Sequence, residues 1–102
     1  MVVVTTEGKP SVADKRNFEM VMSRWGELWP QFRRLIGELM ASYEREAPDW
    51  SNVNCVYLTI PSVPIAEGAE WGIGVVFRSE QTMWTLPYEG WTVCPDQAQA
   101  SY

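Results

Sequence analysis

The sequence predicts an α+β fold in which a long, kinked N-terminal helix packs on a small antiparallel β-meander. Apolar residues recur at helical spacing between residues 18 and 43, and after Pro48 the pattern changes to the alternation of strands. Short turn signals separate the alternating segments from one another. The length of 102 residues suits one domain. Helix and sheet need each other, because neither can bury its apolar side alone.

The helical part is expected over residues 11–47. A capping-box pattern at Ser11–Asp14 places the start of the helix there. Pro30 interrupts the periodic stretch, and a proline inside a helix removes one backbone hydrogen bond. Because the apolar register continues on both sides, one kinked helix is favoured, and a second helix beginning at Pro30 is the alternative. The residue before Pro48 is biased out of the helical region, so the helix should end near Glu46.

The remaining chain is expected to be extended. Residues 1–10 form a short strand and a turn, residues 53–94 form the antiparallel sheet, and residues 95–102 form a flexible tail. The strand of the first segment is Val2–Thr6, and whether it joins the sheet is left open. Four segments alternate as sheet strands do and are bounded by proline or turn residues: 54–60, 71–78, 82–86 and 91–94. Pro87 is expected to begin the turn after the third of them.

The net charge of the chain lies in its second half. Up to Pro48, seven basic residues balance seven acidic ones, whereas from Asp49 onward six acidic residues face the single base Arg78. The same half holds four of the six tryptophans. An acidic surface with large aromatic side chains attracts a basic protein by its field and anchors it with rigid groups. The net charge of −5 and the pI of about 4.6 argue against nucleic acid as a partner, since phosphate binding needs clustered Lys and Arg.

The residue types restrict the chemistry. The chain has no histidine, which removes the most common general base and metal ligand, and we expect no metal and no cofactor. Cys55 and Cys94 are expected as reduced thiols. Gly72-Ile73-Gly74 enters a strand rather than a helix, so it lacks the context of a phosphate-binding loop. We expect a protein that is not an enzyme.

Location in the cell is inferred from what the N-terminal and apolar segments lack. The first residues carry no positive region and too short an apolar run for a signal peptide, and no segment has the apolar length of a membrane span. We therefore expect a cytoplasmic protein with no membrane partner.

A motif in the second half resembles a group of small bacterial domains of unknown function. Glu70-Trp71-Gly72-Ile73-Gly74-Val75 follows a helix and a strand at Cys55–Ile60. The domains that this arrangement resembles pair a long helix with a β-meander, and some relatives are thought to act as immunity proteins beside polymorphic toxins. The resemblance covers the last half of the chain and implies no catalytic residues. The ending Cys94–Ala98 departs from the pattern.

The leading hypothesis is a non-enzymatic protein-binding module, immunity- or inhibitor-like, that binds a basic protein through its acidic, aromatic sheet half. Because alternate strand positions face away from the helix, some aromatic side chains of the sheet should form an exposed contact patch. The predicted contact residues are Trp71, Trp84, Tyr88, Glu80 and Glu89.

Two alternatives are open. A pocket between the kinked helix and the sheet, with Glu67 or Glu70 as the acid–base group, would make the chain a small-ligand-binding domain or an enzyme. A homodimer whose tryptophans bury one another would make it a structural domain.

Overall fold

The computed structural model describes residues 2–6, 8–78 and 80–101. Parts of the predicted N-terminal turn, of the connection after the second predicted sheet strand and of the tail lie outside the described residues: Met1, Glu7, Ser79 and Tyr102. In the part that is described, two α-helices and a six-stranded, mostly antiparallel sheet form an α+β fold, as the sequence predicts.

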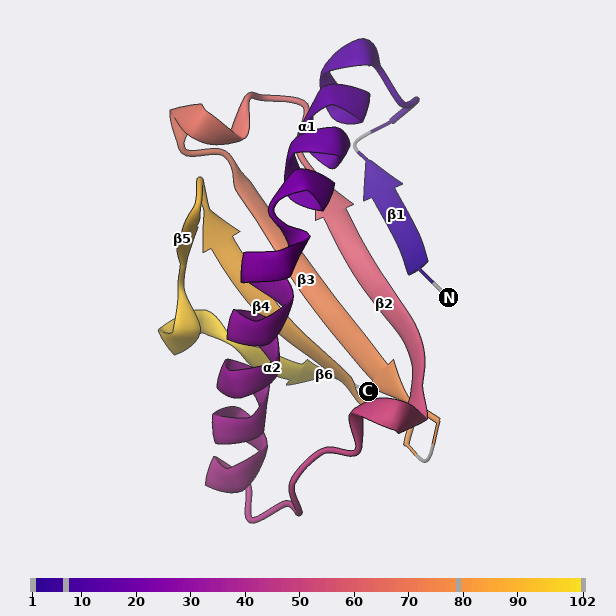
Figure 1. The fold of residues 1–102 in the computed structure, drawn as a ribbon, viewed down its shortest axis with the longest axis vertical. Helices are drawn as coiled ribbons and strands as arrows, with labels where there is room; N and C mark the ends of the chain where they lie inside the picture. The colour runs from indigo at the N-terminus through magenta and orange to yellow at the C-terminus, as the bar shows by residue number, and fades with distance from the viewer. Residues whose placement is uncertain (1, 7, 79, 102) are drawn as a thin grey trace.

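The six strands form one mixed sheet (Figure 1). They are β1 (Val2–Thr6), β2 (Val53–Ile60), β3 (Glu70–Phe77), β4 (Met83–Glu89), β5 (Thr92–Val93) and β6 (Gln99–Ser101). The order is β1-β2-β3-β4, and β5 and β6 both pair with the outer side of β4. β2, β3 and β4 are antiparallel neighbours, so the predicted meander is confirmed. The N-terminal strand also joins the sheet, because both helices form a crossover that brings β1 parallel to β2.

Two predictions for the C-terminal part are wrong. The expected flexible tail contains a short 3₁₀ helix at Pro95–Gln97 and the strand β6. β4 does not end at Pro87 but continues to Glu89. The Pro87 carbonyl accepts a hydrogen bond from the Cys94 N–H (2.9 Å), so the backbone of Pro87 faces the outer edge of β4, in the gap between β5 and β6. The N–H that Pro87 lacks therefore removes no hydrogen bond from the β3–β4 ladder.

The helical part consists of α1 (Val12–Ser23) and α2 (Trp25–Ser42). One long helix kinked at Pro30 is not confirmed, because the chain bends at Arg24 (φ −103°, ψ 8°) and Pro30 lies inside α2. Pro30 is tolerated there because the carbonyl that loses its partner belongs to Gly26, which is exposed to solvent. The bend lets α1 pack over β2 and α2 over β4.

The first turn of α1 carries the predicted capping box. The Asp14 N–H donates to the Ser11 hydroxyl (3.2 Å), and the Asp14 carboxylate accepts from the Ser11 N–H (2.8 Å). The same carboxylate accepts from the Ser62 hydroxyl (2.8 Å), so the cap also holds α1 to the chain that follows β2. The Ser11 and Asp14 side chains thus satisfy one backbone donor each, and the buried Asp14 carboxylate also makes the tertiary contact.

The last turn of α2 ends at Ser42, earlier than the predicted end near Glu46. Glu44 adopts the left-handed backbone conformation with φ 59°. The Arg45 N–H donates to the Met40 carbonyl (2.9 Å), and the Glu44 N–H donates to the next carbonyl (3.0 Å). This is a Schellman motif, in which the position held by Glu44 is usually a glycine.

The core lies between the two helices and one face of the sheet (Figure 1). Alternate residues of β2, β3 and β4 point toward the helices and are buried: Val56, Leu58, Ile60, Trp71, Ile73, Val75, Phe77, Trp84, Leu86 and Tyr88. The helices contribute the buried side chains of Val21, Leu28, Phe32, Ile36 and Met40. The other alternate set of strand residues points away from both helices.

Neither cysteine forms a disulfide. Cys55 is buried on β2 and Cys94 is partly buried after β5. Neither helix in the described residues combines the length and the apolar character that crossing a membrane requires.

Candidate binding cleft

A cleft of about 470 Å³ opens between the end of α2, the α2–β2 connection and the β3–β4 connection. Two core side chains, Met40 and Phe77, contribute to its lining. Its charged lining residues are four carboxylates and one guanidinium: Glu44, Glu46, Asp49, Glu80 and Arg45. We call this site the acidic cleft.

The α2–β2 connection positions three of these carboxylates. The left-handed conformation of Glu44 turns the chain sharply away from α2, so that the residues after it run along the cleft. Asp49 caps the short 3₁₀ helix at Trp50–Asn52, and its carboxylate accepts from the hydroxyl (2.5 Å) and the N–H (3.0 Å) of Ser51. These hydrogen bonds from Ser51 lower the pKa of Asp49, so its carboxylate stays ionised.

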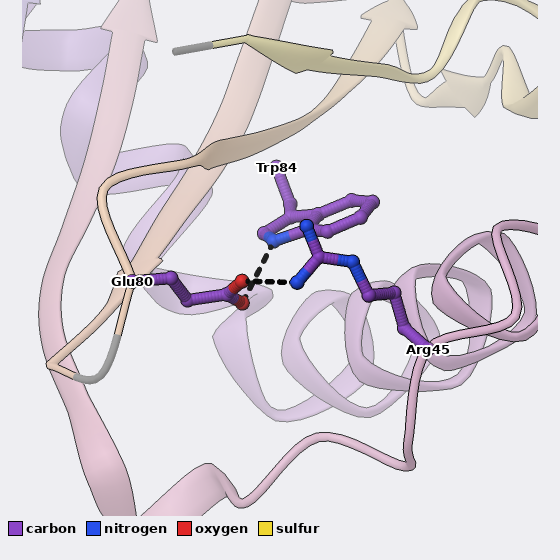
Figure 2. A network of polar contacts seen from close by, with 3 residues as sticks. All are labelled: Arg45, Glu80 and Trp84. Atoms are coloured by element: carbon purple, nitrogen blue, oxygen red, sulfur yellow. Dashed lines mark hydrogen bonds and ion pairs between the residues drawn. The ribbon is translucent and has the colours of Figure 1, made fainter.

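A polar network closes one side of the cleft (Figure 2). The Glu80 carboxylate accepts from Arg45 Nη1 (2.9 Å) and from Trp84 Nε1 (3.2 Å). The Arg45 guanidinium also lies 5.8 Å from the centroid of the Trp84 ring. A carboxylate and an indole thus hold a guanidinium together, which is the combination of charge pairing and ring contact that arginine favours.

The rim beside this network carries an exposed aromatic side chain. Tyr43 is 57% exposed, and its ring centroid lies 5.9 Å from that of Trp84. Trp84 itself is only 1% exposed. Tyr43 does not line the acidic cleft itself but an adjoining hollow, which it shares with Arg45 and Trp84.

The cleft is not neutral. Arg45–Glu80 is the one salt bridge among the described residues, so Glu44, Glu46 and Asp49 face the cleft without a basic partner from that part of the chain. Carboxylates that line one concave site add their potentials and attract cations. Nowhere in the described ranges do three Cys, Asp or Glu side chains converge as a metal site would require. The negative charge is instead distributed along the walls.

The predicted contact residues do not form one surface. Trp71, Trp84 and Tyr88 are 3%, 1% and 1% exposed, so the prediction of an exposed aromatic patch at these residues is wrong. In the β3–β4 register, Trp71 lies opposite Tyr88 and Trp84 lies opposite Val75, all on the side that faces the helices. A partner cannot reach these rings in the folded chain. The alternative of a homodimer whose tryptophans bury one another does not apply to Trp71 and Trp84, because both are already buried within one chain.

Hydrogen bonds complete the burial of these aromatic side chains. Trp71 Nε1 donates to the Gly90 carbonyl (2.6 Å), and the Tyr88 hydroxyl donates to the Gln31 side-chain oxygen (3.1 Å). Burial raises the pKa of Tyr88 to about 12. Their polar atoms are satisfied within the fold, which is typical of structural aromatic residues.

The two predicted glutamates lie at different ends of β4. Glu80 precedes β4 and lines the acidic cleft. Glu89 ends β4, is exposed and lies directly opposite Glu70 of β3. The cleft residues Glu44, Glu46 and Asp49 were not predicted as site residues. Glu44 and Glu46 fall in the predicted helical part 11–47, and Asp49 lies between it and the predicted sheet 53–94.

The alternative pocket between the helices and the sheet is filled. Leu28, Phe32 and Ile36 pack against the sheet there as core residues. Glu67 and Glu70 are exposed and line a shallow groove of about 270 Å³ at the β2–β3 loop. Neither carboxylate is withdrawn from water, as a tuned acid–base group usually is.

Among the sites considered above, the acidic cleft combines a concave shape with unpaired charge most clearly, and we take it as the candidate functional site. Comparison of the chain with protein-family models, with curated proteins and with solved structures finds no match.

Proposed function

We propose that this protein is a cytoplasmic, non-enzymatic protein-binding module, immunity- or inhibitor-like, that binds a basic segment of a protein partner in the acidic cleft. The observation that carries the proposal is the set of three carboxylates without a basic counterpart among the described residues, gathered around one cleft. A basic protein is also the partner that the sequence favours, but the contact residues proposed from the structure differ from those predicted from the sequence. Tyr43 and the cleft carboxylates replace the buried aromatic residues as the expected contact surface.

The charge of the cleft supports a cationic ligand. Glu44, Glu46 and Asp49 act together with the net charge of −5 of the whole chain. A field of this sign speeds the encounter with a basic protein and orients it before contact. The low pKa of Asp49 keeps that part of the field in place under mildly acidic conditions.

The shape of the cleft supports a protein side chain as the ligand. A volume of about 470 Å³ lies within the range of ordinary ligand sites and accommodates the end of an arginine or lysine side chain. The Arg45–Glu80–Trp84 network shows how this chain already holds one guanidinium. Exposed Tyr43 offers a second aromatic surface next to it, and tyrosine is a frequent anchor in interfaces.

The test is binding of a fluorescently labelled hexa-arginine peptide at low salt. The double variant Glu44→Gln/Glu46→Gln should weaken binding about five- to ten-fold, because two of the unpaired charges are removed. The matched control is Glu19→Gln/Glu27→Gln, which removes the same net charge from exposed positions on the two helices. The control should bind almost as well as the natural protein.

Equal losses in both variants would mean that the peptide responds only to the overall charge, and the cleft assignment would be abandoned. A physiological partner is sought by affinity capture from cell lysate at low and high salt. A basic protein captured by the natural chain and lost with the cleft variant, but kept with the control, is the expected result.

A further inference from the structure

The sheet face that points away from both helices carries no charge in its central part. On β2, β3 and β4 this open face consists of the residues that alternate with the core positions. One cross-strand row is Tyr57–Gly74–Thr85 and the next is Cys55–Val76–Met83. The solvent face of an antiparallel sheet is normally polar, often with charged residues. This face departs from that rule in a chain of which 21% is charged.

The surface of the open face is also closely packed. A Cβ added to Gly74 would lie 3.3 Å from the Met83 sulfur and 3.4 Å from the Thr85 hydroxyl oxygen, so these two side chains close over the glycine. Tyr57, Met83 and Thr85 remain partly exposed. The result is a smooth, neutral surface, which suits contact with another flat surface better than contact with water.

In the described part of β3 and β4, the open side carries charges at the two ends of the strand pair. Glu70 and Glu89 alternate with the buried Trp71 and Tyr88, so both point to the open side, directly opposite each other. Like charges in this position destabilise a strand pair. At the other end of β3, exposed Arg78 follows Phe77. On the open side, the β3–β4 pair therefore carries two glutamates at one end and one arginine at the other, with no charge between them. The acidic cleft adjoins the Arg78 end from the side of α2.

We propose that the open face is the interface of a homodimer in which two copies pack sheet against sheet. The two-fold axis lies in the interface and runs perpendicular to the strands. This rotation reverses the strand direction and places the Glu70/Glu89 end of one copy over the Arg78 end of the other. An axis along the strands would instead bring the four glutamates together. The charge pattern thus complements a second copy of itself in one orientation.

The size of the face sets the strength of this dimer. β1, β2, β3 and β4 have five, eight, eight and seven residues, and at about 3.3 Å per residue and about 4.8 Å between strands they cover about 440 Å² per copy. Two copies then bury about 900 Å², which is the size of a weak, transient interface. We therefore expect a reversible dimer that forms in the micromolar concentration range. The acidic cleft, which opens beside the end of α2, stays accessible in both copies.

Sedimentation velocity across a concentration series, from micromolar to near-millimolar, tests the proposal. The natural chain should shift from monomer to dimer, and Thr85→Lys, which places a charge in the central row, should remain monomeric throughout. The matched control is Val12→Lys on α1, which is 76% exposed and lies on the opposite side of the sheet. It should dimerise like the natural chain.

Two results would overturn the proposal. One is a natural chain that stays monomeric at every concentration, and the other is a dimer that Thr85→Lys leaves intact. Circular dichroism verifies that each variant is folded. If Thr85→Lys is unfolded, Arg78→Glu serves in its place, because Arg78 is exposed and lies outside the strand.

A charge exchange tests the orientation. Arg78→Glu alone should weaken the dimer about ten-fold or more, since it faces the glutamates of the second copy twice in the symmetric contact. Combining it with Glu70→Lys and Glu89→Lys exchanges the two ends and should restore the dimer. A triple variant as weak as Arg78→Glu would show that the two ends do not meet. Neither outcome depends on peptide binding in the acidic cleft, so the two proposals fail separately.

Discussion

Replacing Glu44 by glycine should stabilise the fold while weakening the acidic cleft. Glu44 has φ 59° in the Schellman motif that ends α2. The left-handed conformation costs a residue with a Cβ about 1–2 kcal/mol. Glycine avoids this cost but loses about 0.5–1 kcal/mol more conformational entropy on folding. The net expectation for Glu44→Gly is a gain of about 0.5–1 kcal/mol in the free energy of unfolding.

Thermal unfolding measures this gain directly. In a domain of about 100 residues, 1 kcal/mol corresponds to about 4–8 °C, so the Tm of Glu44→Gly should rise by about 2–8 °C. Glu44→Ala is the matched control, because it also removes the carboxylate but keeps the Cβ. The difference between the two variants isolates the backbone contribution from the small effect of a negative charge at a helix C-terminus. If glycine is no more stable than alanine, the strain assigned to Glu44 does not exist.

Peptide binding by the same two variants completes the experiment. Both lack the carboxylate, so both should bind hexa-arginine more weakly than the natural chain and by a similar factor. If both variants bind the peptide as strongly as the natural chain, Glu44 does not contribute to binding in the acidic cleft. The expected pair of results, greater stability with weaker binding for the glycine variant, is typical of strain retained at a functional site.

Three further predictions concern polar groups of the core and helix cap. Asn17→Ala should lower the free energy of unfolding by about 2–3 kcal/mol in urea denaturation, because this buried amide makes three hydrogen bonds to the backbone after β2; a loss near zero would contradict this. Hydrogen bonds from Ser11 and Ser62 hold the pKa of Asp14 below its usual range, so its stabilisation is present above about pH 4 and is lost as the pH falls through the folded-state value. Denaturation at a series of acidic pH values should show a shallower loss for Asp14→Asn, and an unchanged slope would refute the assignment. Burial raises the pKa of Tyr88 to about 12, so its contribution is complete below about pH 10 and is lost as the pH rises further. Absorbance titration should show a phenol with a pKa of about 12 that disappears in Tyr88→Phe, and a titration curve that this substitution leaves unchanged at high pH would argue against it.

The fold class and the meander could be predicted because both depend on local alternation. The break between the helices could not, since Arg24 carries no local signal for it. There the guanidinium lies 4.2 Å from the centroid of the Trp91 ring, a contact made only in the folded chain. Pro30 offered the local signal, but Gly26, whose carbonyl loses its helical partner, is an exposed residue, so the helix continues through Pro30. β6 was equally hidden, because three residues of mixed character become a strand only by pairing with β4.

The candidate site could be predicted only in part. Trp71 has the same alternation phase as Ile73 and Val75, and Trp84 the same phase as Leu86, so strict alternation would have placed both rings in the core. Glycines occupy the opposite phase on β3, which leaves the open face smooth. The acidic cleft was missed because its shape depends on a left-handed residue that is not glycine. A glycine at position 44 would have signalled the end of α2.

The parallel pairing of β1 with β2 bears on the order in which the chain assembles. Val2 meets Val56, so both helices separate the two partners along the chain. Closing so long a loop costs more entropy than closing the short turns of the meander, and it brings in a strand with one paired edge. The residues of β1 are therefore among the last to dock. Their amides should exchange with solvent sooner than those of β3, through partial openings that leave the meander folded.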